Sequence, residues 1–162
     1  MKLIAICGSA LLVLLATIAS AAGTLEAQDA WVREAPPTAT VLGAYLQLHN
    51  HTDRTLTLVH ASSPDFKSVE IHRSSMSNGV ARMTPVPRLV LKAQGVLSFE
   101  PGGLHLMLIE PHRELHAGDK VSITLHFTDH SEFEFSAPVQ KSSGPGDNMS
   151  PEMNHSPDKQ HP

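Results

Sequence analysis

Cysteine is nearly absent from this chain of 162 residues, since Cys7 is the only one. Cys7 lies inside an apolar amino-terminal segment that we expect to be removed, too early and with the wrong neighbours for a lipidation site. The rest of the chain can then form no disulfide, and it offers no thiolate as a nucleophile or metal ligand. Thiol–disulfide exchange and cysteine-based catalysis are therefore excluded.

Clusters of basic residues are also absent. The chain has 12 Lys and Arg against 16 Asp and Glu, a net charge of −4 that becomes −5 without Lys2. This balance disfavours nucleic acid or an anionic membrane surface as a partner. Histidine is abundant instead: all 11 follow the apolar segment, together with five methionines other than Met1. Imidazole and thioether enrichment without cysteine suggests a metal-binding protein.

The amino terminus has the features of a bacterial export signal. Lys2 supplies a short basic region, residues 3–19 form an almost unbroken apolar run, and residues 19–21 (Ala-Ser-Ala) suit a signal peptidase. We predict that residues 1–21 are a signal peptide, that the mature protein lies in the periplasm, and that it has no stable membrane insertion. The alternative is an uncleaved membrane anchor, because the run approaches the length of a spanning helix.

Residues 22–140 have the pattern of a small β domain. Apolar and polar residues alternate, for example in residues 121–127 and 133–137, and this period of two buries one face of each strand. Turn signals recur at short spacing, among them residues 101–103 (Pro-Gly-Gly) and 118–119 (Gly-Asp). The sequence therefore predicts an all-β domain of seven to nine strands, built as a Greek-key sandwich or small barrel.

The composition changes after residue 140. Ten of the 22 residues in 141–162 are Pro, Gly or Ser, and none is aliphatic or aromatic. Such a segment buries nothing that offsets the entropy lost on ordering, so we predict a disordered tail. The tail nevertheless contains four residues of metal-binding types: Met149, Met153, His155 and His161.

Two candidate ligands share one face of a predicted strand. The leucines at 104, 106 and 108 alternate toward one face, so His105 and Met107 lie together on the other, about 7 Å apart. A His-x-Met pair arises by chance roughly 0.4 times per chain of this composition, so it is weak evidence alone. Each residue also has an ordinary alternative, a core methionine or a half-exposed strand histidine.

A second pair comes from a predicted hairpin. Apolar residues at 69 and 71 mark the buried face of one strand, which puts His72 on the other face. Asn78-Gly79 is the typical loop of a type I′ turn, and it pairs residue 77 with residue 80. Met83 then lies diagonally across from His72 on the same face, and Met76 shares that face as a spare thioether.

Two histidines with two methionines have a specific chemical meaning. Thioethers are soft and neutral, and with imidazole they favour Cu(I) while offering little to Mg²⁺, Ca²⁺ or structural Zn²⁺. Neutral ligands also leave the charge of the ion uncompensated, so a partner with thiolates can remove it. The set suits a carrier better than a permanent site.

The spacing of these residues resembles that of a known family. The candidate ligands match without a gap the pattern His-x10-Met-x21-His-x-Met of the PCu(A)C family of periplasmic copper chaperones. Ten residues separate His72 from Met83, twenty-one separate Met83 from His105, and one separates His105 from Met107. Three short segments are similar to this family as well: Ala-Trp-Val-Arg at residues 30–33, Pro-Pro at 36–37 and Pro-Gly-Gly-Leu-His at 101–105. The resemblance covers roughly residues 28–138.

The resemblance implies a cupredoxin-like β-sandwich that holds Cu(I) at an exposed site through His72, Met83, His105 and Met107. It implies delivery of copper for assembly of the copper A centre of cytochrome c oxidase, with subunit II and a Sco-like thiol protein as acceptors. In some members a tail containing His and Met is associated with Cu(II), so the four tail residues are candidate Cu(II) ligands; a solvated end is the alternative. We expect a monomer.

Other functions remain open at this stage. A periplasmic copper-tolerance or storage protein would use the same ligands. An electron-transfer cupredoxin is excluded, because its site needs a cysteine thiolate beside two histidines. A copper-dependent enzyme is disfavoured, since Glu70 is the only acid that the pattern places near the candidate ligands. We therefore expect a protein that is not an enzyme.

Overall fold

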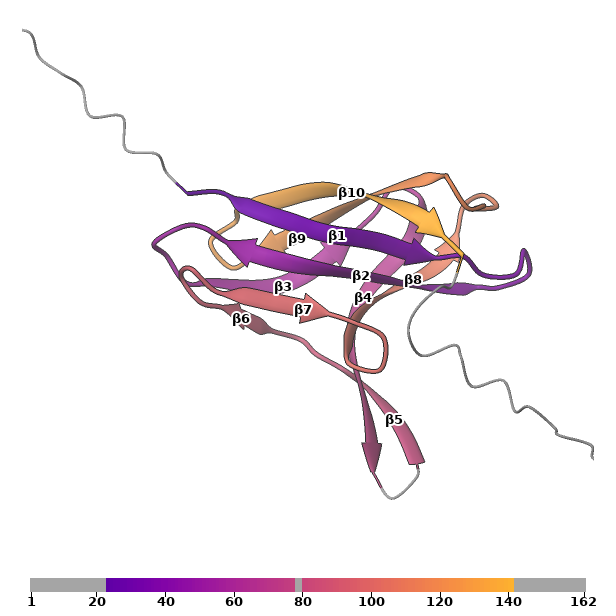
Figure 1. The fold of residues 1–162 in the computed structure, drawn as a ribbon, viewed down its shortest axis with the longest axis horizontal. Helices are drawn as coiled ribbons and strands as arrows, with labels where there is room; N and C mark the ends of the chain where they lie inside the picture. Colours follow the sequence, from indigo (N-terminus) through magenta and orange to yellow (C-terminus); the bar gives the residue numbers. More distant parts are fainter. Residues whose placement is uncertain (1–22, 78–79, 142–162) are drawn as a thin grey trace, which may run out of the picture.

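The computed structural model describes residues 23–77 and 80–141, and within these ranges every regular element is a β-strand (Figure 1). The strands are β1 (Leu25–Arg33), β2 (Val41–Asn50), β3 (Leu56–Ser62), β4 (Phe66–Ser77), β5 (Val80–Pro85), β6 (Leu89–Leu91), β7 (Val96–Phe99), β8 (Leu104–Pro111), β9 (Lys120–Phe127) and β10 (Glu132–Gln140). The all-β prediction is confirmed. The expected number of strands falls short of the ten described, because β6 and β7 have only three and four residues, too few for a clear alternation.

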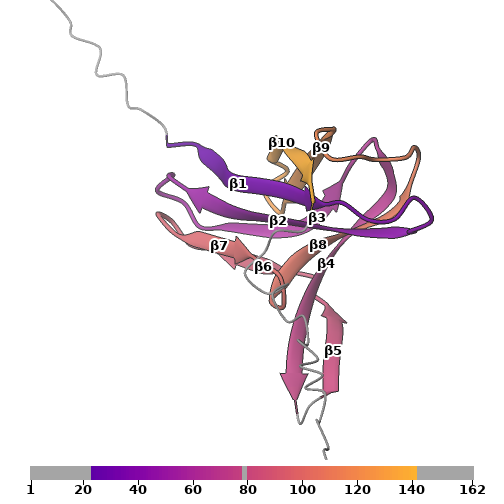
Figure 2. The same cartoon turned by 45° about the vertical axis from the view of Figure 1, so that its right-hand side comes forward.

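Seven of these strands close into a barrel (Figure 2). Hydrogen-bonded neighbours follow the order β4-β8-β2-β1-β10-β9-β3, and the pairing of Ala61 on β3 with Val69 on β4 completes the ring. The three remaining strands extend this ring, since β5 pairs with β4, β6 with β3, and β7 with β2. Strands distant in sequence, such as β2 and β8, lie side by side, as in Greek-key arrangements.

Alternate residues of the strands fill the barrel interior. On β9, Val121, Ile123 and Leu125 are completely buried, whereas the intervening residues are partly exposed. Each such side chain contributes about 1.5–3 kcal/mol when it leaves water. Leu104, Leu106 and Leu108 on β8 are buried in the same core, so the residues between them lie on the outer face of the barrel.

The hairpin of β4 and β5 projects from the barrel (Figure 2). The first part of β4 pairs with β8 from Phe66 to Arg73, and its last part pairs with β5. All six residues of β5 are exposed, so this arm has little core of its own. Its register is the predicted one, with Ser77 opposite Val80. The predicted turn at residues 78–79 lies outside the described residues.

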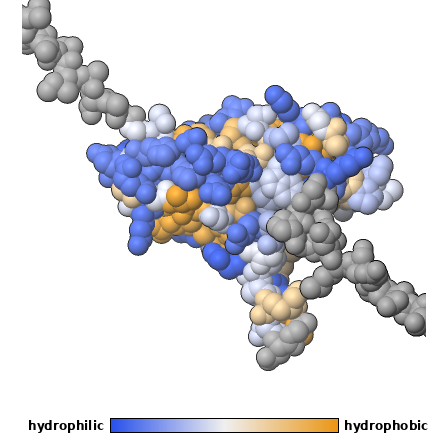
Figure 3. Space-filling model, in the orientation of Figure 1, coloured by the Kyte–Doolittle hydropathy of each residue, from blue (hydrophilic) through white to orange (hydrophobic). Residues whose placement is uncertain are grey.

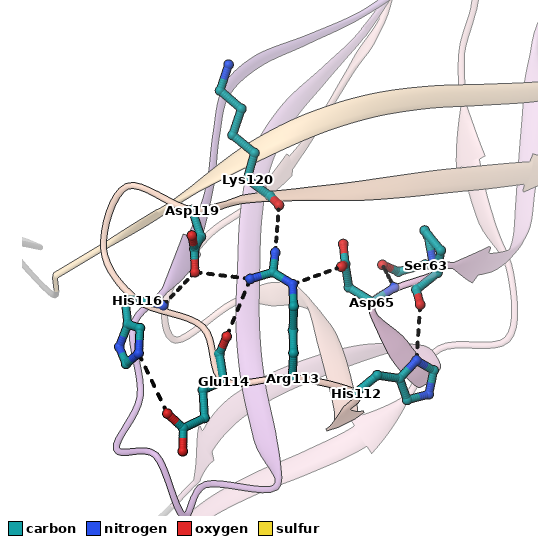
Figure 4. A network of polar contacts seen from close by, with 9 residues as sticks. Ser63, Asp65, His112, Arg113, Glu114, His116, Asp119 and Lys120 are labelled. Carbon is teal, nitrogen blue, oxygen red and sulfur yellow. Dashed lines mark hydrogen bonds and ion pairs between the residues drawn. The ribbon is translucent and has the colours of Figure 1, made fainter.

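Arg113 fixes the other end of the β4–β8 pair (Figure 4). Its guanidinium lies 3.5 Å from a carboxylate oxygen of Asp65, before β4, and 3.1 Å from one of Asp119, before β9. It also donates to the backbone carbonyl of Lys120 at 3.4 Å. This network joins the loop before β4 to the loop between β8 and β9, and β4 runs six residues, about 20 Å, from Phe66 to His72. The hairpin end is therefore free of this bracing.

The strands span residues 25–140, close to the limits predicted for the domain. The predicted signal peptide, residues 1–21, lies outside the described residues. So does the predicted tail from residue 142 onward. Within the described ranges, no helix is long and apolar enough to cross a membrane.

Candidate metal centre

Strand register places the four predicted ligands on one outer face of β5, β4 and β8. His72 on β4 pairs directly with His105 on β8, and Glu70 pairs with Met107. On the other edge of β4, Met83 of β5 lies opposite Ser74, two residues along from His72. Residues two apart on a strand share a face, so all four side chains start from the same side of a three-stranded sheet. The predicted register of the β4–β5 hairpin is confirmed, whereas binding of a metal by these four residues stays a prediction.

The two imidazoles face each other across neighbouring strands. Their ring centres are 6.2 Å apart, and their planes are inclined by 41°. Two imidazoles that bind one ion through bonds of about 2.0 Å have ring centres no more than roughly 6.4 Å apart. His72 and His105 are 9% and 6% exposed, so both rings are nearly withdrawn from water, unlike the exposed site that the resemblance implied.

Glu70 holds the ring of His72. Its carboxylate oxygen Oε2 lies 2.7 Å from Nε2 of His72, whereas Nδ1 of His72 is buried and has no hydrogen-bond partner among the described residues. A carboxylate that accepts the Nε2 proton fixes the tautomer and leaves the Nδ1 lone pair free. A buried lone pair without a partner is uncommon, and a metal ion would satisfy it. The sequence placed Glu70 on this face, but it gave no sign of this orienting role.

The loop before β8 orients His105. Nδ1 of His105 lies 3.1 Å from the carbonyl oxygen of Gly103, which also accepts the backbone N–H of Ser74 at 2.9 Å. If Nδ1 carries the proton, Nε2 remains available as a ligand. Gly102 has a φ of 80°, a conformation that a residue with a side chain rarely adopts. The Pro-Gly-Gly turn thus positions a candidate ligand and connects β7 to β8.

The thioethers differ in exposure. Met107 is partly buried, whereas Met83 is 54% exposed on the projecting hairpin, and the spare Met76 is more exposed still. In the part of the chain that the structure describes, no three His, Cys, Asp or Glu side chains converge into a metal site. Met83 and Met107 are the candidate thioethers on this face, and a set that joins thioethers to imidazoles is soft.

Aromatic residues border this face beyond Met107. Gly43 on β2 pairs with Met107, and a methyl group at Gly43 would lie 2.7 Å from the hydroxyl oxygen of Tyr45. The rings of Tyr45 and Trp31 are 4.7 Å apart, and the guanidinium of Arg33 lies within 6 Å of both ring centres. The sequence showed residues 30–33 only as a motif and did not place them on β1, the second strand from the candidate ligands of β8.

Some of the other histidines of the domain have local partners, whereas the buried Nε2 of His49, like Nδ1 of His72, has no hydrogen-bond partner among the described residues. His126 on β9 bonds to Ser62 through Nε2 at 2.8 Å and to Glu132 through Nδ1 at 3.1 Å. His51 bonds to Glu26 at 2.9 Å, and this bond is the main reason why the pKa of Glu26 is lowered. The four tail residues, Met149, Met153, His155 and His161, lie outside the described residues, so their role stays a prediction.

The fold and this face define a class: a small β-barrel with imidazoles and thioethers gathered on one outer face. Comparisons with known proteins agree with that class. The model of a family described as "Putative lipoprotein LpqE-like" matches residues 25–139, nearly the whole barrel. The chain belongs to this LpqE-like family.

Two curated proteins are similar in sequence. "Putative lipoprotein Lxx21020" of Leifsonia xyli subsp. xyli is 31% identical over 125 residues, which cover 76% of this chain and 74% of that protein. "Uncharacterized protein RP573" of Rickettsia prowazekii is 33% identical over 109 residues, which cover 63% and 59% of the two chains.

Solved structures show the same fold. The Cu(I) form of DR1885 from Deinococcus radiodurans has a TM-score of 0.60 and 33% identity, and the match covers 77% of this chain and 85% of that one. The copper-bound PCuAC domain from PmoF2 has a TM-score of 0.61 and 24% identity, over 75% and 96% of the two chains. At this identity, the PmoF2 match concerns the fold alone. The resemblance to the PCu(A)C family and the cupredoxin-like fold are thus confirmed.

Proposed function

We propose that this protein is a copper chaperone that binds one Cu(I) ion through His72, Met83, His105 and Met107. The observation that carries the proposal is the direct pairing of His72 with His105, with the buried Nδ1 of His72 left without a partner. A structural relative with 33% identity, DR1885, is a Cu(I) form. Copper is the cargo of such a protein, taken up and given away.

The ligand set explains why the cargo would be Cu(I). All four ligands are neutral, and the thioethers suit a soft monovalent ion. Glu70 lies beside the set without belonging to it, because its carboxylate is engaged with His72. Its negative charge, on the far side of the His72 ring, offsets part of the positive charge of the ion. The site would therefore bind Cu(I) without a strongly binding thiolate ligand, so the ion could be released to an acceptor.

Release would begin at the exposed side of the site. Met83 is the most exposed of the four ligands and lies on the hairpin with the least packing. An acceptor thiolate that approaches from solvent would replace this thioether first, and the buried imidazoles last. We propose a thiol-bearing Sco-like protein or subunit II of cytochrome c oxidase as the acceptor, in assembly of the copper A centre. Turnover of a chemical substrate is not part of this role.

We also propose export to the periplasm through the signal sequence at residues 1–21. A relative with 31% identity is named as a lipoprotein, which supports a place in the cell envelope. The tail residues Met149, Met153, His155 and His161 are proposed to add a Cu(II) site, because imidazoles bind the oxidised ion well.

X-ray absorption of the Cu(I)-loaded protein tests the ligand set. The expected spectrum contains both nitrogen and sulfur scattering, and Met83→Leu should lower the sulfur contribution. Met76→Leu is the matched control, because Met76 lies on the same hairpin face but outside the motif. A shell of nitrogen and oxygen alone would refute the proposed ligands.

Truncation after Gln140 tests the proposed Cu(II) site of the tail. The truncated protein should lose most Cu(II) uptake and keep Cu(I) binding intact. Unchanged Cu(II) uptake would make the tail a solvated end.

A further inference from the structure

The segment that contains the hairpin has a charge opposite to that of the rest of the chain. Residues 71–99 include three arginines and one lysine but no Asp or Glu. The remaining 133 residues therefore contain 8 basic and 16 acidic side chains, a net charge of −8, against +4 for this segment. The cations are spaced too widely along the chain to form a cluster in sequence. Such asymmetry directs the approach of a charged partner.

Three of these cations lie on the hairpin or just after it. Arg73 on β4, Arg82 on β5 and Arg88 after β5 are all exposed, and no ion pair or hydrogen bond holds any of their side chains within the described ranges. By contrast, Arg54, Lys67 and Arg113 elsewhere on the barrel each lie within 4 Å of a carboxylate. Free cations on a projecting element are available to carboxylates of another molecule.

The hairpin separates its charges from its thioethers. In the β4–β5 register, Ser74 lies opposite Met83 and Met76 opposite Ala81 on the candidate ligand face. Arg73 and Arg82 start from the reverse face, because they are one residue removed from these positions. Figure 3 shows the arm standing clear of the largely hydrophilic body, with apolar surface near its end. A partner that enclosed this narrow arm would contact both faces at once.

These features favour an acidic protein over an anionic membrane. A lipid surface would attract the arginines, but the −8 charge on the rest of the chain would oppose its close approach. A concave protein site can place acidic groups behind the arm and thiolates before its thioethers. Thiolates are themselves anions, so an acceptor of Cu(I) adds to the negative charge that the arm would meet.

We propose that the β4–β5 hairpin is a docking arm for an acidic, thiol-bearing copper acceptor, whose carboxylates pair with Arg73, Arg82 and Arg88. This inference rests on the proposed function for the identity of the cargo. The binding step itself does not need copper, so it can be tested separately.

The first test uses the copper-free full chain and two peptides. Both peptides contain two cysteines four residues apart, flanked either by four glutamates or by four lysines. Titration of the ¹⁵N-labelled protein with the glutamate peptide should shift amide resonances of residues 71–88 selectively, while the lysine peptide leaves them in place. The triple variant R73Q/R82Q/R88Q should lose these shifts. Shifts spread over the barrel, or retained by the variant, would overturn the docking arm even if Cu(I) binds as proposed.

The second test measures transfer of Cu(I) to the same peptides by stopped flow. At low salt we expect transfer to the glutamate peptide to be about tenfold faster than to the lysine peptide, because attraction raises association rates. The advantage should nearly vanish at 0.5 M salt. R73Q/R82Q/R88Q should lose it at low salt, while the control R54Q/K67Q/K120Q, with the same change of net charge, should keep it. Equal loss in the control would show an effect of net charge alone.

A last measurement distinguishes a membrane partner. The copper-free chain is sedimented with vesicles of 30% phosphatidylglycerol in phosphatidylcholine, and we expect no binding. Binding by the natural sequence that R73Q/R82Q/R88Q abolishes would assign the arm to lipid and overturn the proposal. Failure of the proposed function has a different signature, since a chain that takes up no Cu(I) would still show the peptide-induced shifts.

Discussion

Removing the carboxylate of Glu70 provides the most informative perturbation of the candidate site. Glu70→Ala deletes the group that holds Nε2 of His72 at 2.7 Å, and Glu70→Gln keeps a hydrogen-bond acceptor but removes the charge. The two variants therefore separate the orientation of His72 from the electrostatic effect of Glu70. Both should fold like the natural protein, because the Glu70 side chain is about half exposed and is not part of the core.

The expected magnitudes follow from the geometry. An ion bound at Nδ1 of His72 would lie about 6–7 Å from the carboxylate across the ring, which gives roughly 0.6 kcal/mol in water and 2.5 kcal/mol at an effective dielectric constant of 20. Glu70 is half solvated, so we take about 1 kcal/mol, or a fivefold loss of Cu(I) affinity for Glu70→Gln. Loss of an orienting partner typically lowers metal affinity by about 10–100-fold, the range expected for Glu70→Ala.

Competition with a chromophoric Cu(I) chelator at pH 7.5 measures these affinities. Glu110→Ala is the matched control, because Glu110 has similar exposure and bonds to Lys67 on the same pair of strands, away from the candidate ligands. Its affinity should equal that of the natural sequence. If Glu70→Ala also retained full affinity, the carboxylate would have no part in orienting His72. If Glu70→Gln lost as much as Glu70→Ala, charge rather than orientation would be the main effect.

Three further predictions concern pH, packing and acid stability. Protons and copper compete for imidazole, so Cu(I) affinity should fall below about pH 6; His72→Ala should flatten this dependence, whereas Met83→Leu should weaken binding at unchanged slope. Equal slopes would argue against His72 as a ligand. Leu106→Ala should destabilise the barrel by about 3 kcal/mol in urea unfolding, because Leu106 is fully buried; a loss below about 1 kcal/mol would contradict the core assignment. The pKa of Asp119 is lowered, chiefly by the backbone hydrogen bond from His116, so its stabilising effect is present above about pH 4 and is lost as pH falls through the lower folded-state pKa. Asp119→Asn should therefore show a shallower loss of stability in acid, measured by unfolding at several pH values, and an unchanged acid profile would refute this.

Local pattern determined much of the fold. A period of two identifies β9 and β10 from their own residues, because each strand buries one face whatever its neighbours are. The hairpin register was also predictable, since a two-residue loop fixes which residues pair, and His72 indeed lies opposite Pro85. Spacing and residue type then selected the four candidate ligands before any strand was placed.

Tertiary structure decided everything that depends on strands distant in sequence. Nothing in residues 66–77 indicates that β4 lies beside β8, yet this pairing is what brings His72 opposite His105. The order of strands around a barrel depends on how all their buried faces fit together, and single segments do not encode it. The bond from Glu70 to His72 depends on rotamers within one strand, and a period of two cannot predict them.

The same distinction applies to the charges. The sequence determined that residues 71–99 contain cations without acids, and that the four candidate ligands are neutral. Only the tertiary structure decided that Arg73 and Arg82 project on an arm free of ion pairs within the described residues. Three cations of the barrel do form ion pairs: Arg54, Lys67 and Arg113. Charge is a property of each residue, but its availability depends on which side chains the folded backbone places within about 4 Å.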